Sequence, residues 1–217
     1  MPDFAQTPRA TVHRKAQRAS YARADVYAIL DEAPFCNVGV VEDGRPVVIP
    51  INHWRIGDSL YFHGSPASRL LGVLCAGAEV CVTATLVDGL VLARSAARHS
   101  VNYRSAAVFG RAHEVTDRAA KMAAFAALIE RLAPGRWAEV RPPSDGELNS
   151  VRVAALPIDE ASAKMRAGPP ADTAEDHALP VWAGVVPMRL VTGPPVADDR
   201  LDPAIPLPAS LAPSNAA

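Results

Sequence analysis

The residues best suited to bind a charged group lie where a predicted strand meets a predicted helix, in the segment SLYFHGSPASRLLGVL (59–74). Ser65 is a favourable N-cap, and Pro66 suits the first helical position because its missing N–H is no loss there. That start would place the free N–H groups of the first turn near the Ser68 hydroxyl and the Arg69 guanidinium. A helix N-terminus attracts anions, and arginine adds paired hydrogen bonds that fit a phosphate. The segment predicts a phosphate site, although a simple Ser65 cap beside a solvated Arg69 would also explain it.

Polar residues on neighbouring predicted strands extend this candidate site. Asn52 ends the strand IPIN with a side chain able to pair with the polar edge of a heterocycle. His63 ends the next strand beside the phosphate site, where either a structural hydrogen bond or a direct chemical role fits it. Alternation along the later strand NYRSAAVFG (102–110) divides its residues between two faces: Asn102, Arg104 and Ala106 against Tyr103 and Ser105.

Two other kinds of site are excluded by spacing. The remaining histidines are scattered and form no H-x-x-x-H pair, so no dedicated metal site is expected: His13, His53, His99, His113 and His177. There is no G-x-S-x-G motif, and Ser100 next to His99 on a strand would face the opposite way. A serine nucleophile is therefore not expected either.

Composition is that of one ordinary globular domain. The 217 residues are 49% hydrophobic and 21% charged, and a formal net charge of -1 provides no basic field for nucleic acid or anionic lipid. The start lacks the apolar core of a signal peptide, and no segment approaches the roughly 20 apolar residues of a membrane span. Cys36, Cys75 and Cys81 show no C-x-x-C spacing, which is typical of reduced core cysteines in a cytoplasmic protein. Neither nucleic acid nor a membrane is expected as a partner.

The elements that must position the candidate residues are mostly short strands joined by tight turns. Asp43-Gly44 and Asp88-Gly89 predict the turns of two hairpins. A helix is predicted over residues 23–33, with one apolar face formed by Val26, Ile29, Leu30 and Ala33. A second helix, capped by Thr116 or Asp117, is predicted to stop at 134–135. Hairpins with so few helices exclude a doubly wound parallel sheet and predict a mainly β (α+β) fold, a small antiparallel barrel with attached helices.

The chain divides into three predicted regions. Residues 1–19 form a mobile basic leader and residues 20–167 the barrel domain. The extension 168–217 contains half of the 20 prolines, which favours extended structure with a flexible tail. One apolar stretch, LPVWAGVVPMRL near 179–191, is expected to dock on another surface.

Four motifs together resemble a known family: VIPIN (48–52), LYFHGSPASRLL (60–71), VCVTATLVDGLVLARSA (80–96) and NYRSAAVFGRA (102–112). Their order and spacing resemble the pyridoxamine 5'-phosphate oxidase-related, FMN-binding split-barrel family, and within it the flavin-nucleotide-binding branch that includes the nitroimidazole-resistance proteins. The resemblance covers roughly residues 20–160, and PVWAGVVPMRL (180–190) is similar to the C-terminal signature of that branch. It implies a six-stranded antiparallel split barrel and a homodimer with FMN at the interface.

The resemblance also implies roles for individual residues. His63 matches a histidine near the flavin and is the candidate catalytic residue. The segment that holds the phosphate and ribityl chain is matched by the strand-to-helix junction: His63, Gly64, Ser65, Ser68 and Arg69. The strand whose backbone follows the isoalloxazine ring is matched by Ile49, Pro50, Ile51 and Asn52. A segment close to the cofactor, reaching it from either subunit, is matched by Tyr103, Arg104 and Ser105.

Two residues of the extension are similar to C-terminal residues of the true pyridoxamine phosphate oxidases. Trp182 is expected to contact the cofactor, and Arg189 lies nearby in the sequence. Because their spacing is shorter and the surrounding sequence differs, the vitamin substrate of that enzyme is not predicted.

The function implied is that of an FMN-binding oxidoreductase that passes electrons between the flavin and a small molecule, for example a nitro-aromatic. The alternative is a non-catalytic flavin- or haem-binding module, a sensor or store, because the fold alone does not determine the cofactor. The sequence identifies neither the substrate nor the electron donor, which is NADH, NADPH or a partner protein.

Overall fold

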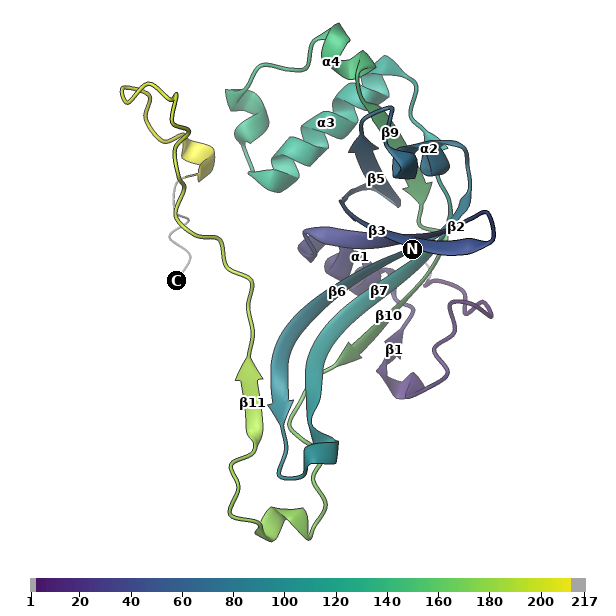
Figure 1. Ribbon diagram of the computed structural model, residues 1–217, viewed down its shortest axis with the longest axis vertical. Coiled ribbons are helices and arrows are strands. Elements are labelled where there is room, and N and C mark those ends of the chain that lie inside the picture. The colour runs from purple at the N-terminus through teal and green to yellow at the C-terminus, as the bar shows by residue number, and fades with distance from the viewer. Residues whose placement is uncertain (1–2, 212–217) are drawn as a thin grey trace.

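The computed structural model describes residues 3–211, which form two antiparallel sheets with helices around them (Figure 1). The large sheet has the strand order β1-β10-β7-β6-β2-β3, and β11 also pairs with β6. Its strands are β1 (Ala19–Ser20), β2 (Phe35–Glu42), β3 (Arg45–Asn52), β6 (Glu79–Leu92), β7 (Ser100–Arg111), β10 (Glu160–Arg166) and β11 (Gly184–Pro187). The small sheet runs in the order β4-β5-β9-β8, with β4 (Trp54–Ile56), β5 (Ser59–Gly64), β9 (Arg152–Pro157) and β8 (His113–Glu114).

Four α-helices and five short 3-10 helices complete the described chain. The α-helices are α1 (Arg23–Glu32), α2 (Arg69–Cys75), α3 (Arg118–Leu132) and α4 (Asp145–Asn149). The 3-10 helices are η1 (Ala16–Arg18), η2 (Ala96–Arg98), η3 (Arg136–Glu139), η4 (Asp176–Ala178) and η5 (Ala209–Leu211). None of the helices within residues 3–211 is both long enough and apolar enough to cross a bilayer.

The prediction of a mainly antiparallel β fold with a few helices is confirmed, but the six-stranded barrel is not. Residues 3–211 contain eleven strands, which form two sheets rather than one closed barrel. His53 interrupts the run between β3 and β4, so the chain leaves the large sheet there and enters the small one. Two strands lie at or beyond the limits of the predicted barrel domain: β1 crosses the boundary expected between residues 19 and 20, and β11 comes from the extension.

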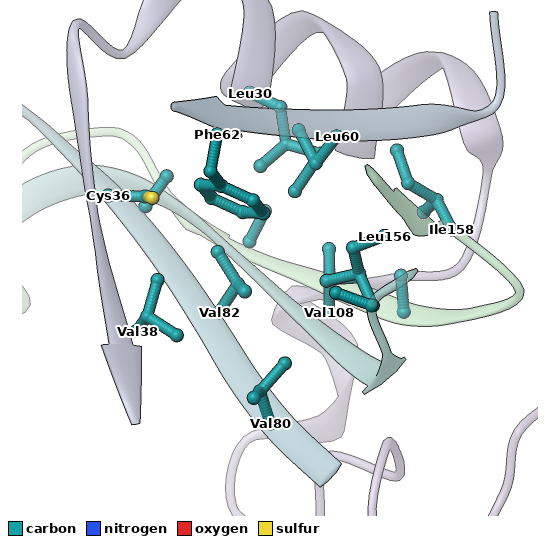
Figure 2. Packing of buried hydrophobic residues seen from close by; sticks show 14 of the residues in the cluster. Leu30, Cys36, Val38, Leu60, Phe62, Val80, Val82, Val108, Leu156 and Ile158 are labelled. Atoms are coloured by element: carbon teal, nitrogen blue, oxygen red, sulfur yellow. The ribbon is translucent and has the colours of Figure 1, made fainter. Parts of the chain in front are cut away.

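The main core lies between α1, the small sheet and one face of the large sheet. α1 buries Val26, Ile29 and Leu30, which confirms the apolar face predicted for this helix. Figure 2 shows Leu30 and Phe62 packed close to Val82 of the large sheet, and all three side chains are fully buried. All three cysteines are free: Cys36 belongs to this core and Cys75 packs against it, whereas Cys81 lies on the other face of β6. Burial raises the pKa of the Cys36 thiol to about 12.

One predicted turn forms and the other does not. Asp43 and Gly44 have φ angles of 48° and 72°, so the left-handed turn between β2 and β3 is as expected. Asp88-Gly89 instead lies within β6, which continues through a bulge between Val87 and Gly89. β7 pairs with one edge of β6 and β11 with the other, and these two partners keep the strand extended. A Cβ at Gly89 would lie 2.9 Å from the Val186 carbonyl oxygen, so the glycine permits β11 to approach.

The N-terminal segment packs on the domain, in contrast to the mobile leader expected. Phe4 is buried and its ring meets Tyr27 edge-on, with 6.1 Å between the ring centroids. Arg9 forms ion pairs with Glu79 and Glu160. The basic residues are therefore used in part to attach this segment to the sheet.

The C-terminal extension returns along the large sheet and then separates from it (Figure 1). Of the apolar stretch expected to dock, near 179–191, residues 184–187 form β11 and pair with β6, whereas Trp182, Leu190 and Val191 stay exposed. Residues 188–208, called the arm below, then run past the body of the domain until Ser210 bonds to Glu139 of η3. The predicted flexible tail includes residues 212–217, which lie outside the described residues.

Candidate functional site

His63 is the candidate residue whose surroundings differ most from water. Alternate residues of β5 face the core, so His63 faces α3 instead. Its ring lies between Trp54 and Phe125, with 5.7 Å and 5.9 Å between ring centroids. Burial lowers the pKa of the imidazole, and within residues 3–211 no hydrogen-bond partner is seen for either ring nitrogen. A neutral imidazole with an open nitrogen can accept a proton or bind a metal ion.

The strand-to-helix junction differs from the prediction in where the helix begins. Ser68, not Ser65, is the N-cap of α2, and its hydroxyl accepts a hydrogen bond from the Leu71 N–H at 3.4 Å. Ser65 instead begins a turn, in which its carbonyl accepts from the Ser68 N–H at 2.9 Å. A Cβ at Gly64 would lie 3.0 Å from Leu71 Cδ2, so this glycine lets the helix close on the strand.

Arg69 is exposed but is not free to bind an anion as it stands. Its guanidinium forms an ion pair with Glu42 of β2, and this hydrogen bond raises the pKa of Arg69. α2 has only seven residues, so its dipole adds little. A phosphate at this junction would have to replace Glu42 as the partner of Arg69.

β3 is an edge strand of the large sheet, and its residues alternate between the two faces of that sheet. Ile49 and Ile51 pack against the core, whereas Pro50 and Asn52 face away from it. Asn52 lines a cavity of about 390 Å³ beside α1 and α3. The other lining residues are Asp31, Glu32, Pro34, Phe35, His53, Leu128, Arg131 and Leu132.

His53 was not singled out by the sequence, yet it is the most buried histidine of the described chain. Its side chain is 1% exposed, and Nε2 donates to the Leu30 carbonyl at 2.8 Å. Nδ1 is buried without a hydrogen-bond partner in the described structure. Desolvation lowers the pKa of His53 to about 4, so the ring is neutral over most of the physiological range.

Arg104 lies in a larger cavity, of about 840 Å³, between β6, β7 and the start of the arm. Its guanidinium forms ion pairs with Glu32 of α1 and Asp88 of β6. The pKa of Glu32 is lowered, chiefly by its hydrogen bond to Arg104. The remaining lining residues are Pro34, Thr85, Leu86, Val87, Pro187, Met188, Arg189 and Leu190.

The structure therefore brings together some of the predicted residues and leaves others apart. Glu32 and Pro34 line both cavities, so the Asn52 and Arg104 regions adjoin around α1. Tyr103 and Ser105 point to the opposite face of β7, where the Ser105 hydroxyl donates to the Lys164 carbonyl at 3.1 Å. Trp182 is 66% exposed and covers Gly184 at the start of β11. Within one chain, Trp182 thus does not join the other candidates.

Sequence reasoning missed the acidic partners of this site. Asp88 was expected to form a turn and Glu32 was not singled out, yet both form ion pairs with Arg104. Glu32 lies between Leu30 and Ala33 of the predicted apolar face of α1, which is the only local signal for its position. In the described residues no cluster of three histidine, cysteine or acidic side chains is arranged to hold a metal ion.

Comparisons with known proteins found relatives of this chain. A family model described as "Pyridoxamine 5'-phosphate oxidase" matches residues 22–165. The flavocytochrome Anf3 from Azotobacter vinelandii is 42% identical, with a TM-score of 0.89 over 96% of this chain and 97% of its own. The FAD and haem binding protein from Mycobacterium smegmatis is 40% identical, with a TM-score of 0.86 over 89% of this chain and 95% of its own.

A more distant structure shares the fold alone. It is a protein associated with 5-nitroimidazole antibiotic resistance from Bacteroides thetaiotaomicron, 24% identical, with a TM-score of 0.56 over 67% of this chain and 85% of its own. A comparison with curated proteins found no match.

Proposed function

The chain belongs to the pyridoxamine 5'-phosphate oxidase family, and we propose that it is a redox protein of this family that binds both a flavin and haem. The observation that carries the proposal is a likeness over nearly the whole chain to a flavocytochrome and to an FAD and haem binding protein. This likeness includes most of the extension, which the family model does not reach. Haem, which the sequence left as an alternative, thus becomes a second cofactor beside the flavin.

His63 fits the role of a haem ligand better than the other histidines of the described chain. Iron binds neutral imidazole, and burial lowers the pKa of His63, which favours the neutral ring. Trp54 and Phe125 flank its ring with apolar surface, which suits a porphyrin face. His53 is also neutral, but its Nε2 is engaged with Leu30 and its Nδ1 is enclosed.

The flavin would be held by the β3 edge and the strand-to-helix junction. Pro50 and Asn52 leave the outer side of the edge strand accessible to a flat ring. The hydrogen-bond donors available for its phosphate are Ser65, Ser68 and Arg69. Arg69 would first have to release Glu42, its present ion-pair partner, and bind the phosphate instead. Arg104 would keep its ion pairs with Glu32 and Asp88 and would place its positive charge beside the cavity.

We propose FAD rather than the FMN expected from the sequence. The terminal phosphate of FMN carries nearly two negative charges, and the Glu42 carboxylate beside Arg69 opposes them. The pyrophosphate of FAD spreads its charge over a longer group and does not concentrate it at Arg69. The FAD and haem binding protein from Mycobacterium smegmatis supports the same choice.

The bound flavin would supply hydride and single-electron chemistry, and the haem single-electron chemistry. The chain itself would orient the two groups and exclude water around them. Trp54 and Phe125 shield His63, and the lowered pKa of its ring would favour binding of the haem iron over binding of a proton. We further propose a homodimer with the flavin at the interface, and a small molecule as the electron partner.

The absorption spectrum of the purified protein tests this function. We expect a Soret band together with a flavin band, and FAD on chromatography of the released cofactor. His63→Ala should lose the Soret band and retain the flavin, whereas the control His113→Ala, at an exposed position, should retain both. Bleaching of the flavin by NADH or NADPH would distinguish a redox enzyme from a storage or sensor module. A protein purified from haem-replete cells without a Soret band would overturn the haem assignment, and released FMN would overturn the choice of FAD.

A further inference from the structure

A short basic loop of the N-terminal segment, residues 13–18, is anchored on both sides. Before the loop, the Val12 N–H donates to the Tyr21 hydroxyl at 3.0 Å. Directly after it, β1 pairs with β10 at the edge of the large sheet. Within the loop, the Lys164 ammonium of β10 donates to the Arg14 carbonyl at 3.1 Å. The loop therefore has a defined backbone, and Figure 1 shows this purple segment on the outside of the sheet beside β1 and β10.

Three cations of this loop have no partner for their side chains: Arg14, Lys15 and Arg18. Within residues 3–211 none of the three side chains forms a hydrogen bond or an ion pair. Most other arginines of the described chain are paired with carboxylates, as Arg152 is with Glu114. The three positive charges of the loop are therefore available to an anion from outside the described chain.

β10 adds two further cations, Lys164 and Arg166, which share one face because alternate residues of a strand point the same way. Arg166 is only 9% exposed, and its hydrogen-bond partners are all neutral. They are the Asn102 side chain and the carbonyls of Gly168 and Pro169, at 3.2 Å and 3.0 Å from the guanidinium. Because no carboxylate within the described residues neutralises it, this buried charge adds to the positive potential of the surface above it.

These five cations, called the cationic surface below, are close enough to repel one another: Arg14, Lys15, Arg18, Lys164 and Arg166. The pKa of Lys15 is lowered, chiefly by repulsion from Arg18, then by desolvation and by repulsion from the other three. The whole chain carries a formal net charge of -1, so the cationic surface attracts anions only within about 8 Å at physiological ionic strength. A partner that touches this surface would therefore benefit from it, whereas a long-range field for polyanions is absent.

We infer that the cationic surface docks an acidic electron-transfer protein, which delivers electrons to the cofactors of this chain. The inference rests on the proposed redox function and names the electron donor, whereas the small molecule of that function would be the acceptor. Its place on the sheet supports this, because Lys164 and Arg166 pair with Ser105 and Tyr103 on the next strand, about 4.8 Å away. Both partners on β7 are candidate cofactor-contacting residues. The docked protein would give up one electron and be oxidised, the cofactors would accept that electron, and no atom would be transferred.

The spread of the cations favours a protein over a small phosphate compound. Arg14 and Lys15 are exposed on the loop, whereas Arg166 is buried in the sheet. Lys164 and Arg166, two residues apart on a strand, are separated by about 7 Å. A phosphate needs donors within about 3 Å of its oxygens, so it would engage only part of this surface. A face with several carboxylates matches the whole of it, and the interfaces of electron-transfer proteins are small and depend on such charge complementarity.

Titration of the purified protein with two acidic redox proteins tests the inference. The probes are a plant-type ferredoxin and a flavodoxin, both of negative net charge. The test variant is Arg14→Glu/Lys15→Glu, and the matched control is Arg45→Glu/Arg200→Glu. All four residues are exposed and have no side-chain partner within residues 3–211, so both variants change the net charge equally and should keep the unfolding temperature of the wild type.

We expect the wild type to bind at least one probe, with an affinity that falls between about 0.05 M and about 0.5 M salt. At the lower salt concentration, the dissociation constant should rise at least about tenfold in the test variant and less than about threefold in the control. Absence of binding for both probes, binding that does not depend on salt, or an equal loss in both variants would overturn the inference. Loss of flavin or haem from the test variant would also overturn it, because the cations would then serve a cofactor. So would tighter binding of the wild type to vesicles that contain phosphatidylserine.

Anaerobic mixing with the reduced probe tests electron delivery, and the cofactor spectrum separates this result from the proposed function. The bound probe should be oxidised while the cofactors are reduced, and more slowly in the test variant than in the control. Binding without oxidation of the probe by the cofactor-loaded protein would overturn the inference. Binding to a protein that holds neither flavin nor haem would refute the function and leave the docking surface. A cofactor-loaded protein that binds neither probe would refute only the inference.

Discussion

Burial of His53 should make the stability of the protein depend on pH in the mildly acidic range. The pKa of this residue is about 4 in the folded chain, against 6.5 for an ordinary histidine, because desolvation disfavours the charged ring. The unfolded chain binds a proton below pH 6.5 that the folded chain does not bind until about pH 4. The free energy of unfolding therefore falls as the pH is lowered through this window.

The size of the effect follows from the difference between the two pKa values. At 1.36 kcal/mol for each pH unit, the full difference is worth about 3 kcal/mol. Of this, about 2 kcal/mol should be lost between about pH 7.5 and pH 5, where the folded ring is still neutral. That loss is a large fraction of the stability of a typical domain, about 5–15 kcal/mol.

Urea unfolding of the wild type and of His53→Gln at about pH 7.5 and pH 5 measures this contribution. Glutamine can still donate to the Leu30 carbonyl but does not titrate. We expect the variant to lose about 2 kcal/mol less than the wild type on acidification, whatever its stability at neutral pH. His113→Gln, at an exposed position, should behave like the wild type. Equal pH dependence in the wild type and His53→Gln, to within about 0.5 kcal/mol, would refute the reasoning.

Two further predictions concern β11 and the strand-to-helix junction. Gly89→Ala would bring a Cβ to 2.9 Å from the Val186 carbonyl oxygen, so amide exchange in β11 should speed up by about 5- to 150-fold, corresponding to about 1–3 kcal/mol. The control Gly72→Ala, whose Cβ would meet no atom within 4 Å, should leave the exchange rate of β11 unchanged. An unchanged exchange rate in Gly89→Ala would show that the contact does not matter. Arg69→Ala should weaken binding of FAD or FMN by about ten- to a hundredfold in a fluorescence titration and leave riboflavin binding unchanged. Glu42→Gln should strengthen binding of the phosphorylated flavins, because it removes the competing carboxylate. An equal loss of riboflavin affinity in Arg69→Ala would show that this arginine supports the fold instead.

Short-range features were predictable because neighbouring residues in the sequence cause them. The apolar face of α1 follows from helical periodicity, and Asp117 caps α3 by accepting from the Ala120 N–H at 2.7 Å. The Asp43-Gly44 turn forms because both residues tolerate a positive φ. The order of four motifs was enough to identify the family, since it reflects a whole pattern of strands and turns.

Long-range pairing was not predictable, and it determined the parts that differ. β10, with the sequence EASAKMR, has little β propensity but is a strand because β7 and β1 pair with its two edges. Asp88-Gly89 has the composition of a turn but stays extended between β7 and β11.

The sequence alone thus determined the mainly β fold class and the family, and it singled out the polar residues of the candidate site. Only the tertiary structure decided which partners those residues have: Glu42 for Arg69, Glu32 and Asp88 for Arg104, and an apolar enclosure for His53. Local steric preferences act over a few residues and can be read along the chain. Ion pairs and burial depend on residues far apart in the sequence, whose contacts exist only after the sheets have formed.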